Sequence, residues 1–287
     1  MDTSVAVVAV KALVYFTCLT AAGGALFLVL FGGQMVQAER QNVLRFARAM
    51  AVLALYATMA RVLSLSAMLG DEWASAWDET LIRMILDGTE GRAVAARSAG
   101  LVVLALALFA GGRAMAIALV GSLAVVASFG LTGHTGSDGP LAASMVALHL
   151  IAVAYWVGAL VPLYGLAGAA HQERLASILT RFGNLAVGFV GTLVIAGLAL
   201  LWLLLGSVEA VVTSSYGRLV LLKLGFVTAL LLLAAINKLR LTPAVAAGQA
   251  GAWQHLRISI AAEIALVLAI FVVTAAFTTI TGPPEME

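Results

Sequence analysis

Long apolar runs separated by short polar connections dominate the chain. Hydropathy predicts eight helices, which cover residues Val5 to Phe31, Phe46 to Leu69, Ala93 to Ala110, Ala114 to Leu131, Leu141 to Leu166, Phe182 to Leu205, Arg218 to Leu239 and Leu256 to Ile280. Several of these runs reach the roughly 20 residues that a helix needs to cross about 30 Å of hydrocarbon. The pattern predicts an all-α integral membrane protein of about eight transmembrane helices, embedded in a lipid bilayer.

Composition agrees with this fold class and excludes others. Hydrophobic residues make up 63% of the chain and charged residues 10%, against roughly 25% charged residues in a typical soluble domain. The net charge of +2 is small and its basic residues are scattered, so no nucleic-acid surface is indicated. No phosphate-binding loop is present, which leaves passive or gradient-coupled transport. The first run lacks a basic leader and a cleavage site, so we expect a retained helix rather than a signal peptide.

The basic residues predict how the chain is oriented, because cytoplasmic connections carry an excess of Lys and Arg. Nine basic residues lie in or beside the odd-numbered connections and three on the other side. This distribution places both termini in the periplasm and the connections after the second, fourth and sixth helices at the outer face. The nine are Arg40, Arg45, Arg48, Arg113, Arg174, Arg181, Lys238, Arg240 and Arg257, and the three are Arg83, Arg92 and Arg218.

Short motifs recur between the two halves of the chain. Gly24-Ala25-Leu26 matches Gly158-Ala159-Leu160, and Arg45-Phe46 matches Arg181-Phe182. Further matches join Gly91-Arg92 with Gly217-Arg218, and Leu131-Thr132-Gly133 with Ile280-Thr281-Gly282. The repeat predicts two four-helix units, residues 1–136 and 137–287. Because four is even, both units point the same way, and a pseudo-twofold axis along the membrane normal should relate them.

The connection at residues 70–92 is unusually long for this chain. It spaces Trp73, Trp77, Leu81 and Ile85 four residues apart, which predicts a helix lying in the membrane interface. The alternative is a lid that packs on the helix ends without any role in ligand binding.

Two histidines and a methionine carry the predicted chemistry. His134 lies where the fourth predicted helix leaves the membrane, and His149 lies eight residues into the fifth. Met145 precedes His149 by four residues and therefore shares its helix face. Imidazole and thioether suit copper, Cu(I) more than Cu(II), and neutral imidazole avoids burying a charge. The three residues form a candidate copper site open to the periplasm. The alternative is that His149 only hydrogen-bonds a neighbouring helix and His134 is a loop residue.

Ionisable residues within predicted spans are also functional candidates, because charge is costly in lipid. Lys11, Arg61, Arg97 and Lys223 fall in the outer half. They suit an anion, a carboxylate such as Asp138 or haem propionates, and some could instead extend to the interface. The acidic Glu263 lies deep in the last helix, with Asn237 and Lys238 as candidate partners.

These residues resemble the copper resistance D (CopD) family of bacterial inner-membrane proteins over most of the chain. The resemblance is strongest in SSYGRLVLLKLGFVTALLLLAAINKLRLTPAV from Ser214 to Val245, and it continues through Glu263 at the family's acidic position. LDGTEGRAVAAR from Leu86, GHTG around His134 and ALHLIAVAYWVGALVPL around His149 look like further family motifs.

The resemblance implies copper transport across the inner membrane, usually uptake, with a separate periplasmic copper-binding partner of the copper resistance C type. It carries His134 and His149 over as candidate ligands and leaves Met145 open. The leading hypothesis is therefore a copper permease rather than an enzyme. A haem-binding redox protein with histidine axial ligands is the alternative, and a copper sensor or scaffold is a third.

Overall fold

The computed structural model describes residues 3–132, 140–169, 172–205 and 215–280, and every regular element within these ranges is helical. Seven helices are long and apolar enough to cross a membrane. They are α1 (Thr3–Phe31), α2 (Gln37–Leu69), α4 (Thr89–Ala110), α7 (Pro140–Ala169), α8 (Gln172–Leu205), α10 (Ser215–Ile236) with its extension to Ala246, and α12 (Ala252–Ile280).

The shorter elements lie between these helices. α5 (Met115–Ser128) continues into the 3-10 turn η4 (Phe129–Leu131), and α3 (Glu79–Asp87) follows the 3-10 turn η2 (Trp73–Trp77). α10 passes through a π-helical segment, η5 (Asn237–Leu241), into α11 (Thr242–Ala246). The stretch Met115–Leu131, where the sequence predicts an eighth span, is apolar but shorter than the other seven.

Two helices begin earlier than hydropathy predicts. α2 starts at Gln37 rather than Phe46, and α8 starts at Gln172 rather than Phe182. The added turns are polar, and the Glu39 side chain caps α2 by accepting a 3.0 Å hydrogen bond from the Val36 N–H. Hydropathy does not detect turns of this kind, because side chains rather than lipid satisfy their backbone groups.

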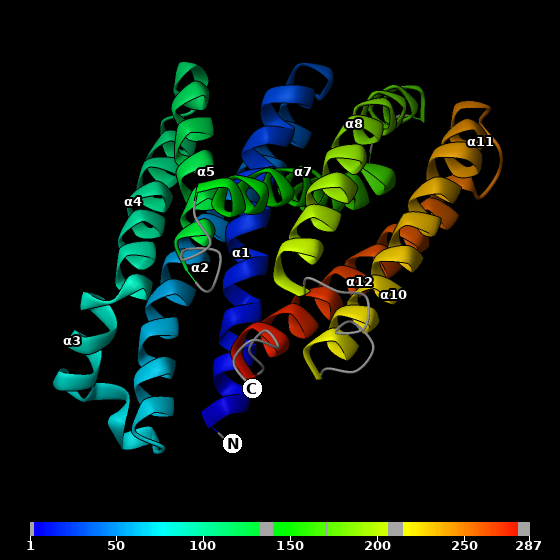
Figure 1. Ribbon diagram of the computed structural model, residues 1–287. Helices are drawn as coiled ribbons and strands as arrows, with labels where there is room; N and C mark the ends of the chain where they lie inside the picture. The colour runs from blue at the N-terminus through cyan, green and yellow to red at the C-terminus, as the bar shows by residue number, and fades with distance from the viewer. Residues whose placement is uncertain (1–2, 133–139, 170–171, 206–214, 281–287) are drawn as a thin grey trace.

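Helix α1 forms the centre of the bundle. It packs against α2, α5, α7 and α12, and α7 crosses it obliquely in the view of Figure 1. The start of α1 and the end of α12 lie at the same end of the bundle as α3 (Figure 1). An element surrounded in this way must present small side chains where its neighbours approach most closely.

The α1–α7 crossing depends on two glycines. A Cβ built on Gly158 would lie 2.3 Å from the backbone of Gly23, and one built on Gly23 would lie 1.8 Å from the Ala154 carbonyl oxygen. No larger side chain fits without separating the helices. Gly24, which the repeat pairs with Gly158, borders this contact only through its backbone nitrogen, and a Cβ built on it would lie 3.1 Å from Ala47 of α2.

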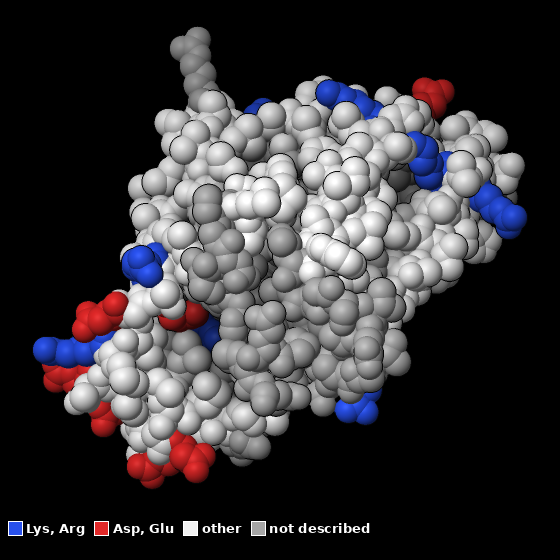
Figure 2. Space-filling model, in the orientation of Figure 1, with Lys and Arg blue, Asp and Glu red and all other residues white. Residues whose placement is uncertain are grey.

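The basic connections gather at the end opposite α3, which we call the arginine-rich end. Arg174 at the start of α8 forms a 2.9 Å ion pair with Glu39 at the start of α2. Arg48 Nη2 donates a 2.8 Å hydrogen bond to the Leu108 carbonyl oxygen near the end of α4. Figure 2 shows acidic side chains together at the α3 end and a broad uncharged surface between the two ends. An apolar belt between two charged ends is what a bilayer requires.

The long connection forms two elements rather than the single helix that its four-residue spacing predicts. Asp78 ends η2 and caps α3, since its Oδ1 accepts from the N–H groups of Thr80 and Leu81 at 2.8 and 3.1 Å. Of the predicted apolar face, Ile85 is buried on α2 and α4, whereas Trp77 is 75% exposed. The connection therefore covers the helix ends through α3 and leaves an aromatic side chain exposed at this end.

We predict that Gly158→Ala destabilises the protein and that Gly165→Ala does not. The first adds a methyl group against the Gly23 backbone, whereas a Cβ at Gly165 meets nothing within 4 Å. Overpacking of this kind costs about 1–3 kcal/mol. Thermal unfolding in detergent should show a lower Tm for Gly158→Ala alone. Equal Tm values for the two variants would show that the crossing does not depend on close backbone approach.

Candidate functional site

His149 lies on the buried side of α7, facing α8. Its Nδ1 is 3.4 Å from the Leu193 carbonyl oxygen, and its ring is 3.6 Å from where a Cβ on Gly197 would lie. When Nδ1 carries the proton, it donates to Leu193 and leaves the Nε2 lone pair free for a ligand. This contact is the hydrogen bond to a neighbouring helix that the alternative hypothesis predicts. It also orients Nε2 as a candidate metal donor.

The other predicted ligands are placed less fully. Met145 is half-buried one turn before His149 on α7. His134, like Asp138, lies outside the described residues. Within the described part of the chain, no group of three or more His, Cys, Asp or Glu side chains comes together as a metal site. The His134, His149 and Met145 site therefore stays a prediction.

A positive charge lies near His149. The Lys223 ammonium on α10 is close enough to act electrostatically on the imidazole, and its Nζ lies 5.5 Å from the centre of the Phe277 ring. Like charge weakens the binding of a cation. A copper ion at this position would therefore be held by soft donor bonds against an electrostatic cost.

The remaining cations that the sequence predicts in the outer half contact several helices. Arg61 on α2 is 6% exposed and forms a 3.5 Å ion pair with Glu90 at the start of α4. Arg97 Nε donates to Ser128 Oγ at 3.2 Å, and its guanidinium stacks 4.3 Å from the centre of the Phe129 ring. Buried guanidinium groups need such partners, because lipid offers none.

Lys11 extends this set to α12. Its Nζ donates a 2.8 Å hydrogen bond to the Thr278 carbonyl oxygen near the end of that helix. These cations were predicted from the sequence, but Glu90, the partner of Arg61, was not. Glu90 could have been recognised by its position in the first turn of α4, where a carboxylate is favoured.

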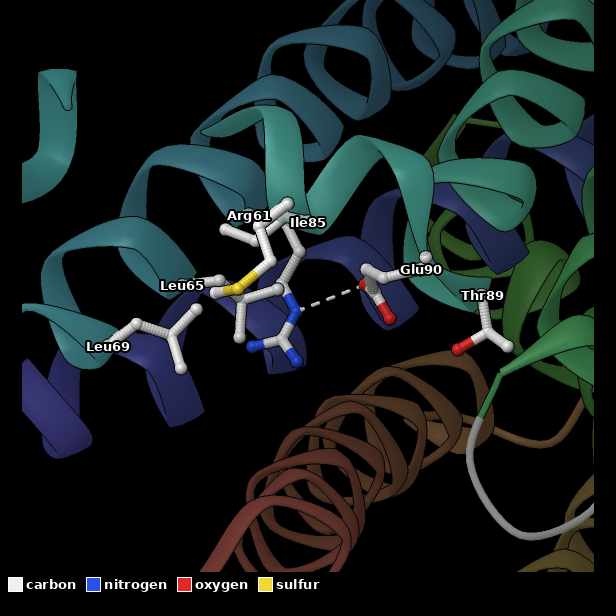
Figure 3. Close-up of a pocket in the computed structure, with 8 residues that line it drawn as sticks. Arg61, Leu65, Leu69, Ile85, Thr89 and Glu90 are labelled. Atoms are coloured by element: carbon white, nitrogen blue, oxygen red, sulfur yellow. Dashed lines mark ion pairs between the residues drawn. The ribbon is translucent and has the colours of Figure 1, made fainter. Parts of the chain in front are cut away.

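A cavity of about 280 Å³ opens beside the Arg61–Glu90 pair. Figure 3 shows the Arg61 side chain paired with Glu90 at the cavity, with Leu65, Leu69 and Ile85 among the apolar side chains that line it. Met84 also lines the cavity. The cavity lies at the α3 end, between α2, α3 and α4.

Glu263 forms a second polar cluster inside the bundle. It is 3% exposed; its Oε2 accepts a 3.0 Å hydrogen bond from Trp156 Nε1, and its Oε1 accepts one from Asn237 Nδ2. The predicted partner Asn237 is confirmed, but the predicted partner Lys238 is wrong. Lys238 Nζ instead donates to the Gly183 carbonyl oxygen at 2.7 Å, because the long lysine side chain reaches the polar backbone of α8 near the arginine-rich end.

Trp156 belongs to the motif around His149, but its contact with Glu263 was not predicted. It lies seven residues after His149, on the same face of α7. A buried indole N–H needs a hydrogen-bond acceptor. A tryptophan and a carboxylate within the predicted spans were therefore the features that could have indicated this contact. Helix α7 therefore carries both His149, the candidate metal ligand, and Trp156, which donates a hydrogen bond to Glu263.

Comparisons with known proteins agree with the resemblance found in the sequence. Residues 1–144 match the family model described as Copper resistance protein D-like, N-terminal domain, and residues 176–277 match Copper resistance protein D. Copper transport protein CutJ of Bacillus subtilis (strain 168) is 27% identical over 95% of this chain. The chain spans 52% of the length of that relative. No solved structure matches.

We predict that Glu90→Gln destabilises the protein, because it leaves the buried Arg61 guanidinium without a counter-charge. The Glu90 side chain is 26% exposed, so solvent screens part of the effect and the expected cost is about 1–3 kcal/mol. The control is Glu79→Gln, which removes the Arg83–Glu79 pair, with side chains 73% and 78% exposed. That change should leave the unfolding midpoint unaltered. Similar midpoints for both variants would mean that the Arg61 pair does not stabilise the fold.

Proposed function

The chain belongs to the copper resistance protein D family, and from this premise we propose that it transports copper across the bacterial inner membrane, as uptake from the periplasm. Copper is the cargo, and the proposed binding residues are His134, His149 and Met145. The observation that carries the proposal is the placement of His149. Its half-buried ring lies at the α7–α8 contact, with the Met145 thioether one turn away on the same helix.

The donor set suits a permease better than a storage site. Neutral imidazole and thioether favour Cu(I), and they add no negative charge to a lipid-embedded pocket. The nearby Lys223 ammonium opposes cation binding and so limits affinity. A transported ion must bind firmly enough to enter the site and weakly enough to leave it.

We place the route between the two four-helix halves, residues 1–136 and 137–287. The stretch Met115–Leu131 then counts as the eighth span, and both termini lie in the periplasm with the α3 end. The close packing of α1 on α7, the first helices of the two halves, supports this arrangement, because a twofold axis brings equivalent helices together. Basic residues at the opposite end support its assignment to the cytoplasm.

The proposed supplier of copper is a separate periplasmic copper-binding protein of the copper resistance C type. It would approach the α3 end, where acidic side chains and the exposed Trp77 are found (Figure 2). The named relative is described as a copper transport protein and is nearly twice as long as this chain.

We predict that His149→Ala and His134→Ala each weaken copper binding by about tenfold or more, since each removes a first-sphere ligand. Met145→Leu keeps the side-chain volume and should produce a smaller loss. Titration of purified protein with Cu(I) against a competing chelator measures all three affinities, and proteoliposome flux measures transport.

His255→Ala is the matched control, because His255 is exposed at the arginine-rich end of α12. It should bind and transport copper as the wild-type protein does. Unchanged binding and flux in both His134→Ala and His149→Ala would overturn the proposed site. Binding by the wild-type protein without flux would indicate a sensor or scaffold.

A further inference from the structure

Glu263 is a buried carboxyl group that copper binding at the proposed site does not use. It lies eleven residues after the start of α12 at Ala252, which is about 16 Å along the helix axis. Its two hydrogen-bond partners, Trp156 and Asn237, are both neutral. A carboxylate held this way within an apolar bundle carries an uncompensated charge, and protonation removes that cost.

Among the described residues, no cationic side chain faces Glu263 from the elements packed on α12. Several charged and titratable groups of those elements contact other groups. On α1, Lys11 donates a hydrogen bond to Thr278, and the centre of the Tyr15 ring lies 6.2 Å from that of Phe271. Lys223 of α10 lies over the Phe277 ring, and Lys238 of η5 donates to Gly183. On α12 itself, the Arg257 guanidinium lies 4.4 Å from the centre of the Tyr164 ring of α7.

Polar atoms without a protein partner extend from Glu263 toward the arginine-rich end. Asn237 Oδ1 and Ser259 Oγ are both buried and make no hydrogen bond within the described residues. Ser259 is one helical turn from Glu263 on α12, on the same face and nearer the start of the helix. Buried polar atoms of this kind are the usual sites of internal water.

The local backbone is also unusual at this point. Asn237 opens the π-helical segment Asn237–Leu241, which interrupts the regular hydrogen-bond ladder between α10 and α11. Single π turns inside α-helices occur frequently at functional sites. Three helical segments, α7, η5 and α12, therefore each contribute one polar side chain to a single buried point.

We infer that Glu263 is a proton-binding site that exchanges protons with the arginine-rich end and couples them to copper movement. The carboxylate accepts one proton from water at that end and becomes a neutral acid. Rotation of the Asn237 amide then lets the new O–H donate to Asn237 Oδ1, while Trp156 keeps its bond to the other oxygen. Release of the proton to water at the α3 end, in the state that follows copper movement, completes the exchange of one proton for one Cu(I).

The coupling part of this inference rests on the proposed copper transport. Its physical basis is α7, which carries His149 and, two turns further along the same face, Trp156. A shift of α7 that accompanies copper binding would move the indole relative to Glu263. Such a shift changes the relative free energy of the two protonation states, and by linkage protonation changes copper affinity.

The test compares the wild-type protein with Glu263→Gln, Glu263→Asp and the control Glu173→Gln in proteoliposomes at clamped membrane potential. Glu173 is an exposed carboxylate at the arginine-rich end. One proton exchanged per Cu(I) lets a gradient of one pH unit support about tenfold copper accumulation. We expect this accumulation in the wild-type protein, Glu263→Asp and Glu173→Gln, and none in Glu263→Gln.

Infrared difference spectroscopy gives a readout that does not require transport. A pH-dependent carboxylic acid band should be present in the wild-type protein and in Glu173→Gln, and absent from Glu263→Gln. Copper transport driven equally by a pH gradient in the wild-type protein and Glu263→Gln, or by a sodium gradient instead, would refute the proton site. A titrating band in a protein that moves no copper would refute the transport proposal and keep the proton site.

Discussion

The fold depends on the inability of lipid to form hydrogen bonds. Every polar atom between the two charged ends must find a partner inside the protein or incur a large free-energy penalty. The backbone meets this requirement through helices, and the buried side chains meet it through a few contacts between helices. Arg61 pairs with Glu90, Arg97 with Ser128, and Glu263 with Trp156 and Asn237. These contacts fix which helices are neighbours, while glycines such as Gly23 and Gly158 set how closely they approach.

The sequence predicted what depends on hydropathy and spacing along the chain. The helical class and the approximate limits of the apolar spans follow from runs of apolar residues, and the Asn237–Glu263 contact follows from two polar residues at similar depth. Partners that depend on how helices are arranged were missed: Lys238 reaches α8 rather than Glu263, and Arg61 binds Glu90. The break between η2 and α3 was also missed, because Asp78 caps a helix inside a regular four-residue pattern.

The polar clusters suggest how the two halves of the proposed mechanism are separated in space. Arg61 and Glu90 line a cavity at the α3 end, whereas Glu263 lies in the half of the bundle nearer the arginine-rich end. Helix α7 packs on α1 through Gly158. It carries His149 toward α8 and Trp156 toward α12. Helix α7, which carries the candidate metal ligand His149 and contacts the Glu263 carboxyl group through Trp156, provides a direct physical connection between the two proposed sites.

The central claim is that copper binds soft nitrogen and sulfur donors on α7. X-ray absorption spectroscopy of the copper-loaded protein tests it most directly, because the spectrum distinguishes sulfur from lighter atoms around the metal. We predict nitrogen and sulfur scatterers in the wild-type protein, loss of the sulfur contribution in Met145→Leu, and a smaller nitrogen contribution in His149→Ala, in which His134 remains. A first shell of oxygen and nitrogen alone, identical in all three proteins, would contradict the account.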